Sequence, residues 1–256
     1  MEISIVGSGN VAWHLAKFFH QNGHRIGTIY NRTMATGQQL AAEVKAGFLP
    51  LNGEISSKSD LLILAVKDDV IVETVAKIQP NPGTIVLHTA GATPLSVLDK
   101  FDRYGVIYPP QSLSKEVTVN LAEIPFAIEG SDYQVQQHII QLMQSLAPKS
   151  FACDTRQRLT LHVGAVFVNN FVNALYQIGY NLLADAELDF ELLRPIILET
   201  AKKAQNNIPK DVQTGPASRN DKKTINRHLE LLSNNETTKE IYQQLTSFLV
   251  KQGHNL

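Results

Sequence analysis

The chain has 256 residues, 43% of them hydrophobic, which is enough for one large or two modest domains with an ordinary packed core. Its 23 Lys and Arg against 24 Asp and Glu give a formal charge of −1, so no global field favours nucleic acid or an anionic membrane as a partner. Cys153 is the only cysteine, which excludes an intramolecular disulfide and a cysteine-based zinc site, and we predict no metal site.

The first residues predict an apolar strand rather than a targeting segment. Residues 1–9 lack the basic stretch and the long apolar run of a signal peptide or membrane anchor. With no sign of an oxidising compartment either, we expect a cytoplasmic protein.

Short apolar runs then alternate with helical segments through the first half. This order predicts an α/β domain with a parallel, doubly wound sheet. Because the runs lack polar alternation, helices should cover both faces of the sheet. The predicted strands are Ile3–Val6, Arg25–Tyr30, Leu61–Val66, Thr84–His88, Gly105–Tyr108, Pro125–Ile128 and a last short one at Phe151–Cys153.

From about Asp154 onward the pattern is helical, with no convincing strand. We therefore expect an α/β domain over residues 1–154 and an all-α domain over 155–256. Asp154 or Thr155 could cap the first helix, which should run to about Leu183. Loops should follow around 184–189 and 206–221.

Two shorter helices should end the chain, each with an apolar stripe at helical spacing. We interpret the stripes as core, and they also permit a homodimer. Their residues are Ile225, Leu229 and Leu232 in the first and Ile241, Leu245, Phe248 and Leu249 in the second.

The first strand runs directly into G-x-G-x-x-A and then a helix, which is the dinucleotide fingerprint in its required context. Gly7 allows the tight turn, Gly9 lets backbone N–H groups approach a pyrophosphate, and Ala12 keeps the helix close to the strand. The helix dipole adds positive charge at this end. The alternative is a fold that no longer binds nucleotide. The predicted contacts are Gly7, Ser8, Gly9, Asn10 and Val11.

The second strand ends Asn31-Arg32-Thr33, without the carboxylate that an NAD site presents to the ribose. Arg32 can pair with a 2′-phosphate and stack on adenine, and its two neighbours can hydrogen-bond the same phosphate. The sequence therefore predicts NADP(H) as the cofactor. The alternative is that Arg32 is a solvated surface residue.

Later strand ends should complete the edge where an open α/β sheet binds its ligand. We expect backbone contacts from Val66-Lys67 and His88-Thr89-Ala90 to the ribose and nicotinamide. Lys67 could equally be an ordinary loop charge and His88 a hydrogen-bonded, half-buried residue. The turn containing Pro110 and Gln111 is suited to edging a pocket, or is a simple loop.

On the long helix, His162, Asn169 and Asn173 lie within about 20° of one line at 100° per residue. His162 could exchange a proton, and the asparagines could orient a substrate carbonyl or the nicotinamide amide. The other interpretation is that these side chains bond neighbouring helices.

A second polar group precedes the Ile225 helix. Asp221 with Thr224 three residues later is a reasonable N-cap, and Arg219 could clamp a carboxylate or phosphate. His228 could face the same pocket. A structural ion pair of Arg219 is the alternative.

Together these elements resemble an uncharacterised bacterial family that joins a Rossmann-like NADP-binding domain to a helical domain of unknown function. The resemblance covers essentially the whole chain, and Gly-Pro-x-x-Arg-x-Asp with a downstream histidine is its most specific part. This chain has Asn220 where the family usually has Gly, and Lys67 where the family commonly has Pro. Asn tolerates the left-handed backbone next best after Gly, so the turn could survive.

The architecture is more distantly similar to pyrroline-5-carboxylate reductases, proteins like 6-phosphogluconate dehydrogenase, and deazaflavin-dependent NADP reductases. This implies hydride transfer and dimerisation through the helical domain. The β-hydroxyacid dehydrogenases also carry a catalytic lysine before an Asn-Asn pair on this helix. Val166 stands at that position here, so their acid–base chemistry is not carried over.

The leading hypothesis is an NADP(H)-dependent oxidoreductase that transfers a hydride to or from a small C=O or C=N substrate in an interdomain cleft. His162 would donate the proton, Asn169 would orient the substrate, and Arg219 would hold a carboxylate or phosphate. The alternative is a non-catalytic NADP(H)-binding sensor that acts through its helical domain. The residues expected to line the substrate pocket are Pro110, Gln111, Asn173, Asp221 and His228.

Overall fold

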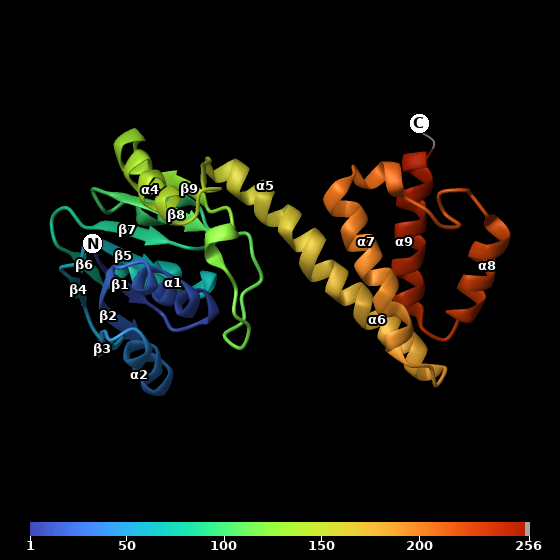
Figure 1. Cartoon of the computed structure of the whole chain (residues 1–256), viewed down its shortest axis with the longest axis horizontal. Helices are drawn as coiled ribbons and strands as arrows, with labels where there is room; N and C mark the ends of the chain where they lie inside the picture. The colour runs from blue at the N-terminus through green and yellow to red at the C-terminus, as the bar shows by residue number, and fades with distance from the viewer. Residues whose placement is uncertain (254–256) are drawn as a thin grey trace. The chain divides into compact units, whose positions relative to one another are not determined.

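The computed structural model describes residues 1–253 and contains two compact units, Met1–Asn170 and Phe171–Leu256 (Figure 1). The first unit holds all of the strands in the described residues, and the second is helical. An α/β domain followed by helices is the fold predicted from the sequence, and it is confirmed.

The strands of the first unit form two sheets. In chain order they are β1 (Glu2–Val6), β2 (Arg25–Asn31), β3 (Gly47–Pro50), β4 (Ile55–Ser57), β5 (Leu61–Leu64), β6 (Ile78–Pro80), β7 (Ile85–His88), β8 (Tyr104–Tyr108), β9 (Ala127–Gly130) and β10 (Phe151–Ala152). The main sheet has eight strands in the order β10-β9-β8-β7-β5-β1-β2-β3, and β4 pairs with β6 in a small separate sheet. All pairs are parallel except β8–β9.

Apolar side chains alternate between the two faces of the main sheet, so both faces are buried. The helices of this unit are α1 (Asn10–Gln21), α2 (Met34–Glu43), α3 (Ile71–Ala76), α4 (Tyr133–Leu146) and α5 (Thr155–Ala165). On β5, Leu61 and Ile63 join the cluster with α1, α2 and α4, whereas Leu62 and Leu64 join the cluster with α3.

The structure adds details that the sequence analysis did not predict. β3, β4 and β6 were missed because they are short and carry little apolar signal; β6, for example, reads Ile-Gln-Pro. The antiparallel β8–β9 pair also departs from the expected parallel sheet. Parallel neighbours need a crossover, usually a helix, and between these two strands there is only a loop with a 3₁₀ turn at Leu121–Glu123.

Helix α5 begins as predicted, because Asp154 is its N-cap. The Asp154 side chain accepts a hydrogen bond from the Gln157 amide, and the Gln157 side chain accepts one from the Asp154 amide. The compact units nevertheless divide between Asn170 and Phe171 rather than at Asp154/Thr155. The reason is that α5 packs on the sheet through the fully buried Arg158, so it belongs with the first unit.

The long helix expected to reach Leu183 is not uniform. A π-helical segment, Val166–Phe171, separates α5 from α6 (Val172–Asp185). The helical unit continues with α7 (Arg194–Asn206), α8 (Lys222–Leu231) and α9 (Glu236–Gly253). The loops expected near 184–189 and 206–221 fall between these helices.

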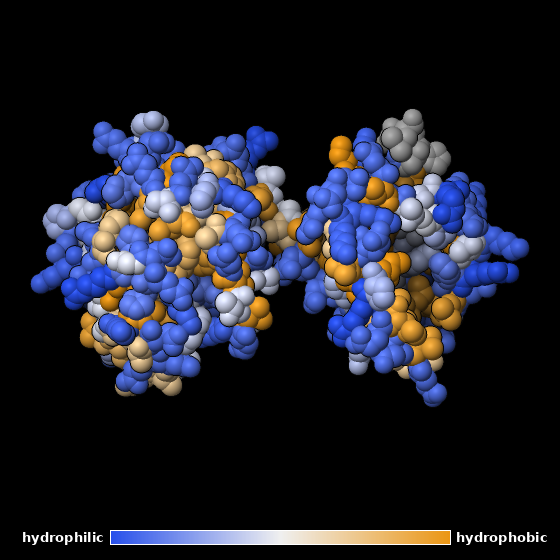
Figure 2. Space-filling model, viewed as in Figure 1, coloured by the Kyte–Doolittle hydropathy of each residue, from blue (hydrophilic) through white to orange (hydrophobic). Residues whose placement is uncertain are grey.

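The helical unit buries very little of its apolar surface. Between residues 171 and 252, only Ala217 and Leu232 are buried apolar side chains. Leu245 and Phe248, predicted to be core, are 44% and 57% exposed. Figure 2 shows hydrophobic side chains on the visible surface of this unit. The prediction that these stripes form a core is therefore wrong for Leu245 and Phe248 in the single chain, whereas Leu232 is buried and the other stripe residues are half-buried.

No helix among residues 1–253 combines the length and the apolar character needed to cross a membrane.

Candidate functional site

The turn between β1 and α1 has the geometry that the glycine fingerprint predicts. Gly7 has φ +113°, and a Cβ there would lie 2.3 Å from the Ala65 carbonyl oxygen. Only glycine fits this turn without strain. A Cβ on Gly9 would meet no atom within 4 Å, so the space in front of Gly9 is open.

The N-terminus of α1 is available to an anion. Its N-cap is Gly9, no side chain caps it, and its first turn contains no acidic residue. The first amides of a helix lack intrahelical acceptors and carry the positive end of the dipole. Open space beside uncapped amides fits a dinucleotide pyrophosphate.

A pocket of about 360 Å³ extends from this turn along the carboxyl ends of β1, β2 and β5. It brings together eight of the predicted cofactor contacts. They are Gly7, Ser8, Gly9, Asn31, Arg32, Thr33, Val66 and Lys67. Asn10 and Val11, at the start of α1, are not among the residues that line it.

The pocket also holds charged residues that the sequence analysis missed. Glu73 and Lys77 on and just after α3 line it and form an ion pair of 2.6 Å. The hydrogen bond from Lys77, then its charge and more weakly that of Arg32, lower the pKa of the Glu73 carboxyl. Arg32 itself is exposed, and no carboxylate lies within salt-bridge distance of it in the described chain. The guanidinium is therefore free to meet an anion.

Hydrogen bonds join the first two strand ends. The Ser8 hydroxyl donates to Thr36 Oγ1 at 2.8 Å. The Asn31 side-chain Nδ2 donates to Thr36 Oγ1 at 3.1 Å and to the Thr33 carbonyl at 2.8 Å. Thr36, in the first turn of α2, was not identified from the sequence. Its position shows that Ser8 and Asn31 help to hold the two turns together.

His88, at the end of β7, is enclosed rather than half-buried. Its side chain is fully buried, and Nδ1 accepts a hydrogen bond from the Ala90 amide at 3.1 Å. Burial, and then the charge of Arg158, lower the pKa of His88 to about 3, so the ring is neutral at physiological pH. Thr89 and Ala90 are also buried. None of these three residues lines the 360 Å³ pocket, and their contact with a cofactor stays a prediction.

His162 on α5 meets the end of β8. Tyr108 Oη lies 3.0 Å from His162 Nδ1, and the two rings pack edge to face. Burial raises the pKa of Tyr108, which keeps the phenol protonated at physiological pH. A Cβ on Gly91 would lie 2.5 Å from His162 Nδ1. Gly91 therefore makes room for the imidazole beside the loop that follows β7.

Arg158, one turn before His162, organises that loop. Its guanidinium donates to Glu129 Oε2 at 3.0–3.1 Å and, from Nη1, to the carbonyls of Ala90 (2.8 Å) and Gly91 (3.0 Å). Thr155 donates to the other oxygen of Glu129. Arg158 is fully buried and Glu129 is 6% exposed. The two buried charges thus neutralise each other, and Arg158 fixes the Ala90 and Gly91 carbonyls relative to α5.

Neither Arg158 nor Glu129 was identified from the sequence, although a signal existed. Arg158 stands at i−4 from His162, on the same helical face. A long charged side chain on the face that packs on a sheet requires a buried partner.

The polar stripe predicted along the long helix does not continue through the π-helical segment. The π-helical segment interrupts the 100° spacing on which the common line of His162, Asn169 and Asn173 depended. Asn169 and Asn173 are exposed, whereas His162 is half-buried. Of the three, the structure places only His162 in a defined polar contact, which is with Tyr108.

The turn after β8 keeps its predicted residues near the surface. Pro110 is half-buried, and the Gln111 side chain is exposed and accepts a hydrogen bond from the Ser112 amide at 2.9 Å. Their role in a substrate pocket stays a prediction.

The remaining candidates lie in the helical unit. Asp221 caps α8 as predicted, accepting hydrogen bonds from the Thr224 amide and hydroxyl, and these bonds lower its pKa. Asn220 has φ +52°, the left-handed conformation expected for it. His228 Nδ1 lies 2.8 Å from Tyr242 Oη on α9, and Arg219 is exposed. The anion-clamp role of Arg219 stays a prediction.

Within residues 1–253, no three His, Cys, Asp or Glu side chains are grouped so that they could hold a metal ion.

Two family models match the chain. The one described as "NADP oxidoreductase coenzyme F420-dependent" matches residues 2–91, and "Domain of unknown function (DUF2520)" matches residues 124–248. The first match contains the glycine turn and every residue that lines the 360 Å³ pocket. No curated protein matches the sequence.

Solved structures share the fold over nearly the whole chain. Protein BF3122 from Bacteroides fragilis, provisionally described as an NADP oxidoreductase, is 33% identical, with a TM-score of 0.87 and 98% of each chain covered. Protein TM1727 from Thermotoga maritima is 18% identical, with a TM-score of 0.76, covering 99% of this chain and 98% of that one. A 1-pyrroline-5-carboxylate reductase from Streptococcus pyogenes is 16% identical, with a TM-score of 0.61, covering 100% and 99%.

Proposed function

The chain belongs to the family that joins an NADP oxidoreductase domain of the coenzyme F420-dependent type to a DUF2520 domain, and from this premise we propose that it is an NADP(H)-dependent oxidoreductase acting on a small C=O or C=N substrate. The observation that carries the proposal is the pocket that unites Gly7, Gly9 and Arg32 at one edge of the sheet. Gly9, which lines the pocket, is the N-cap of α1, and the uncapped helix amides beside it suit a pyrophosphate.

The charges around the pocket favour NADP(H) over NAD(H). Arg32 offers a guanidinium without a carboxylate partner in the described chain, and Lys77 adds a second cation. Two carboxylates, Asp69 and Glu73, also line the pocket, and Lys77 already engages Glu73. A 2′-phosphate therefore has a charge-assisted partner in Arg32 that a ribose hydroxyl cannot use as well.

Replacing Arg32 by alanine should weaken NADPH binding by roughly 30-fold and leave NADH binding nearly unchanged. A hydrogen bond to a charged group contributes about 2 kcal/mol, which corresponds to that factor. Nicotinamide fluorescence titrations of wild type and variant at fixed ionic strength would measure both affinities. Arg25→Ala, at the opposite end of β2, is the matched control. Equal affinity of the wild type for the two cofactors would refute the NADP preference.

NADPH, when bound, supplies the hydride. The chain's own residues bind the cofactor, orient the substrate and protonate it. Tyr108 stays protonated and can donate to His162 Nδ1, which leaves the single proton of the neutral imidazole on Nε2. When His162 takes up a second proton from solvent, the imidazolium can give its Nε2 proton to the substrate oxygen or nitrogen and return to the neutral ring. Arg158 holds the Ala90 and Gly91 carbonyls beside this ring.

The His162→Ala variant should reduce substrate turnover by about 100-fold while binding NADPH with wild-type affinity, because general acids contribute at least this much. NADPH oxidation at 340 nm with 1-pyrroline-5-carboxylate and a panel of carbonyls and cyclic imines would supply the assay. Tyr108→Phe should show a smaller loss in turnover. Full activity of His162→Ala would remove this residue from the mechanism. Failure of the wild type on the whole panel would favour the non-catalytic sensor.

We also infer that the chain forms a homodimer through its helical unit. A unit of this size normally encloses a core, yet this one buries only two apolar side chains in its described part. A self-complementary partner is the simplest cover for such a surface. Light scattering after size exclusion should give twice the 28.3 kDa chain mass. A monomeric mass at micromolar concentration would contradict the inference.

A further inference from the structure

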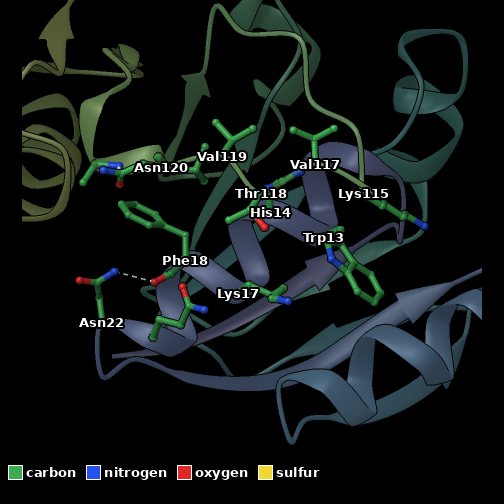
Figure 3. A pocket seen from close by; sticks show the side chains of 13 residues that line it. Trp13, His14, Lys17, Phe18, Asn22, Lys115, Val117, Thr118, Val119 and Asn120 are labelled. Atoms are coloured by element: carbon green, nitrogen blue, oxygen red, sulfur yellow. Dashed lines mark hydrogen bonds between the residues drawn. The ribbon is translucent and has the colours of Figure 1, made fainter.

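The first unit contains a second pocket that no part of the proposed function uses. It lies between α1 and the connection from β8 to β9, and its volume is about 580 Å³, within the range of small-molecule sites. One wall runs along α1 from Trp13 to Asn22, and the other is formed by residue 115 and residues 117–122. Figure 3 shows Val117 and Val119 on the loop side, with Lys17 and Trp13 on the helix side.

Two lysines, one from each wall, lie close to the same indole. Lys17 Nζ lies 5.7 Å from the centre of the Trp13 ring, and Lys115 Nζ lies 5.4 Å from it. Both distances are within reach of cation–π attraction. Lys17 also pairs with Glu43 at 2.7 Å, whereas Lys115 has no carboxylate partner within 4.0 Å in the described part of the chain. Lys115 therefore presents a positive charge without a close ion-pair partner beside a flat apolar surface.

The described lining of this pocket contains no acidic residue. Two carboxylates lie close to this wall in sequence. The hydrogen bond from the Ser114 hydroxyl, and more weakly the charge of Lys115, lower the pKa of Glu116, and Glu123 accepts a hydrogen bond from the Asn120 side-chain amide. The electrostatic balance inside the pocket is consequently positive, which favours an anionic occupant.

The loop wall is held in place without a ligand. His14 is buried, and its Nε2 lies 2.9 Å from the Ser114 carbonyl oxygen, which fastens the start of the loop to α1. Farther along, Asn120 Oδ1 accepts a hydrogen bond from the Ala122 amide. A wall that is already ordered lowers the entropic cost of binding.

We propose that this pocket binds a small planar aromatic carboxylate, with its ring against Trp13 and its carboxylate between Lys17 and Lys115. The flat indole provides area for the ring, and the two ammonium groups provide charge-assisted hydrogen bonds to the carboxylate. The site is separate from the dinucleotide edge, because the two pockets share no lining residue.

Trp13 is the only tryptophan in the chain, so its fluorescence reports on this pocket directly. The probe is 4-nitrobenzoate, a planar, non-fluorescent quencher, titrated into the full-length protein with correction for absorption by the probe. We expect saturable quenching, about tenfold weaker affinity for the uncharged 4-nitrobenzamide, and no comparable binding of acetate. Equal affinity for the acid and the amide, or the absence of saturation, would overturn the proposal.

Variants of Lys115 separate charge from structure. Lys115→Met should weaken 4-nitrobenzoate binding about tenfold, and Lys115→Arg should keep it within about threefold of wild type. Lys149→Met, an exposed lysine outside the pocket, is the matched control and should change nothing. Saturating NADP⁺ should leave the affinity for the probe unchanged. Competition by NADP⁺ would show that the probe occupies the dinucleotide pocket and would refute the second site.

Discussion

Replacing Arg158 by methionine should lower the free energy of unfolding of the first unit by about 3–5 kcal/mol. The substitution leaves Glu129, which is 6% exposed, as a buried charge without its cation. It also removes the donors that hold the Ala90 and Gly91 carbonyls. Urea denaturation followed by the fluorescence of Trp13, which lies in the same unit, would measure the loss.

Two controls test whether burial is the cause. Arg25→Met breaks the pair with Glu2, in which the side chains are 78% and 37% exposed, and should cost less than about 1 kcal/mol. The double variant Arg158→Met with Glu129→Leu removes both charges and should recover much of the lost stability. A loss as small for Arg158→Met as for Arg25→Met would mean that water reaches the Glu129 carboxylate when the arginine is gone.

The first half of the fold was predictable because its signals are local. Strands such as Leu61–Leu64 are continuous apolar runs, and the glycine fingerprint predicts both a tight turn with a positive φ and the start of a helix. Short edge elements such as β3 carry no such pattern. The direction of β9 was not predictable either, since it depends on whether the preceding connection contains a helix.

The site residues also fall into some that local sequence patterns predict and others that only the tertiary structure reveals. Gly7, Gly9 and Arg32 follow a spacing rule and were predicted together, and the structure brings them into one pocket. Arg158 and Glu129 are far apart in sequence, and their role follows only from the packing of α5 on the sheet. The second pocket is equally non-local, because its two lysines are almost a hundred residues apart. Pairwise contacts of this kind need the tertiary structure.

The two glycines of the fingerprint should respond differently to the same added methyl group. Gly7→Ala should reduce NADPH affinity by roughly 1,000-fold and lower the free energy of unfolding by about 3 kcal/mol. The new Cβ would lie 2.3 Å from a backbone oxygen that cannot swing away, at a φ of +113° that alanine rarely adopts. To relieve the clash the turn has to shift away from the position that suits the pyrophosphate, and a loss of about 4 kcal/mol of binding free energy corresponds to a factor of that size in affinity.

Gly9→Ala, by contrast, should leave stability unchanged or raise it by up to about 1 kcal/mol, because Gly9 has φ −71° and its Cβ meets nothing within 4 Å. That open space is where a pyrophosphate would approach the α1 amides. NADPH affinity should therefore fall about 10- to 100-fold in a normally folded protein. Gly53→Ala, exposed and equally free of contacts, should change neither property. Parallel urea denaturations and NADPH titrations of the three variants would separate fold from binding. Wild-type affinity in Gly9→Ala would mean that the cofactor does not lie against this turn, and the proposed dinucleotide site would have to be abandoned.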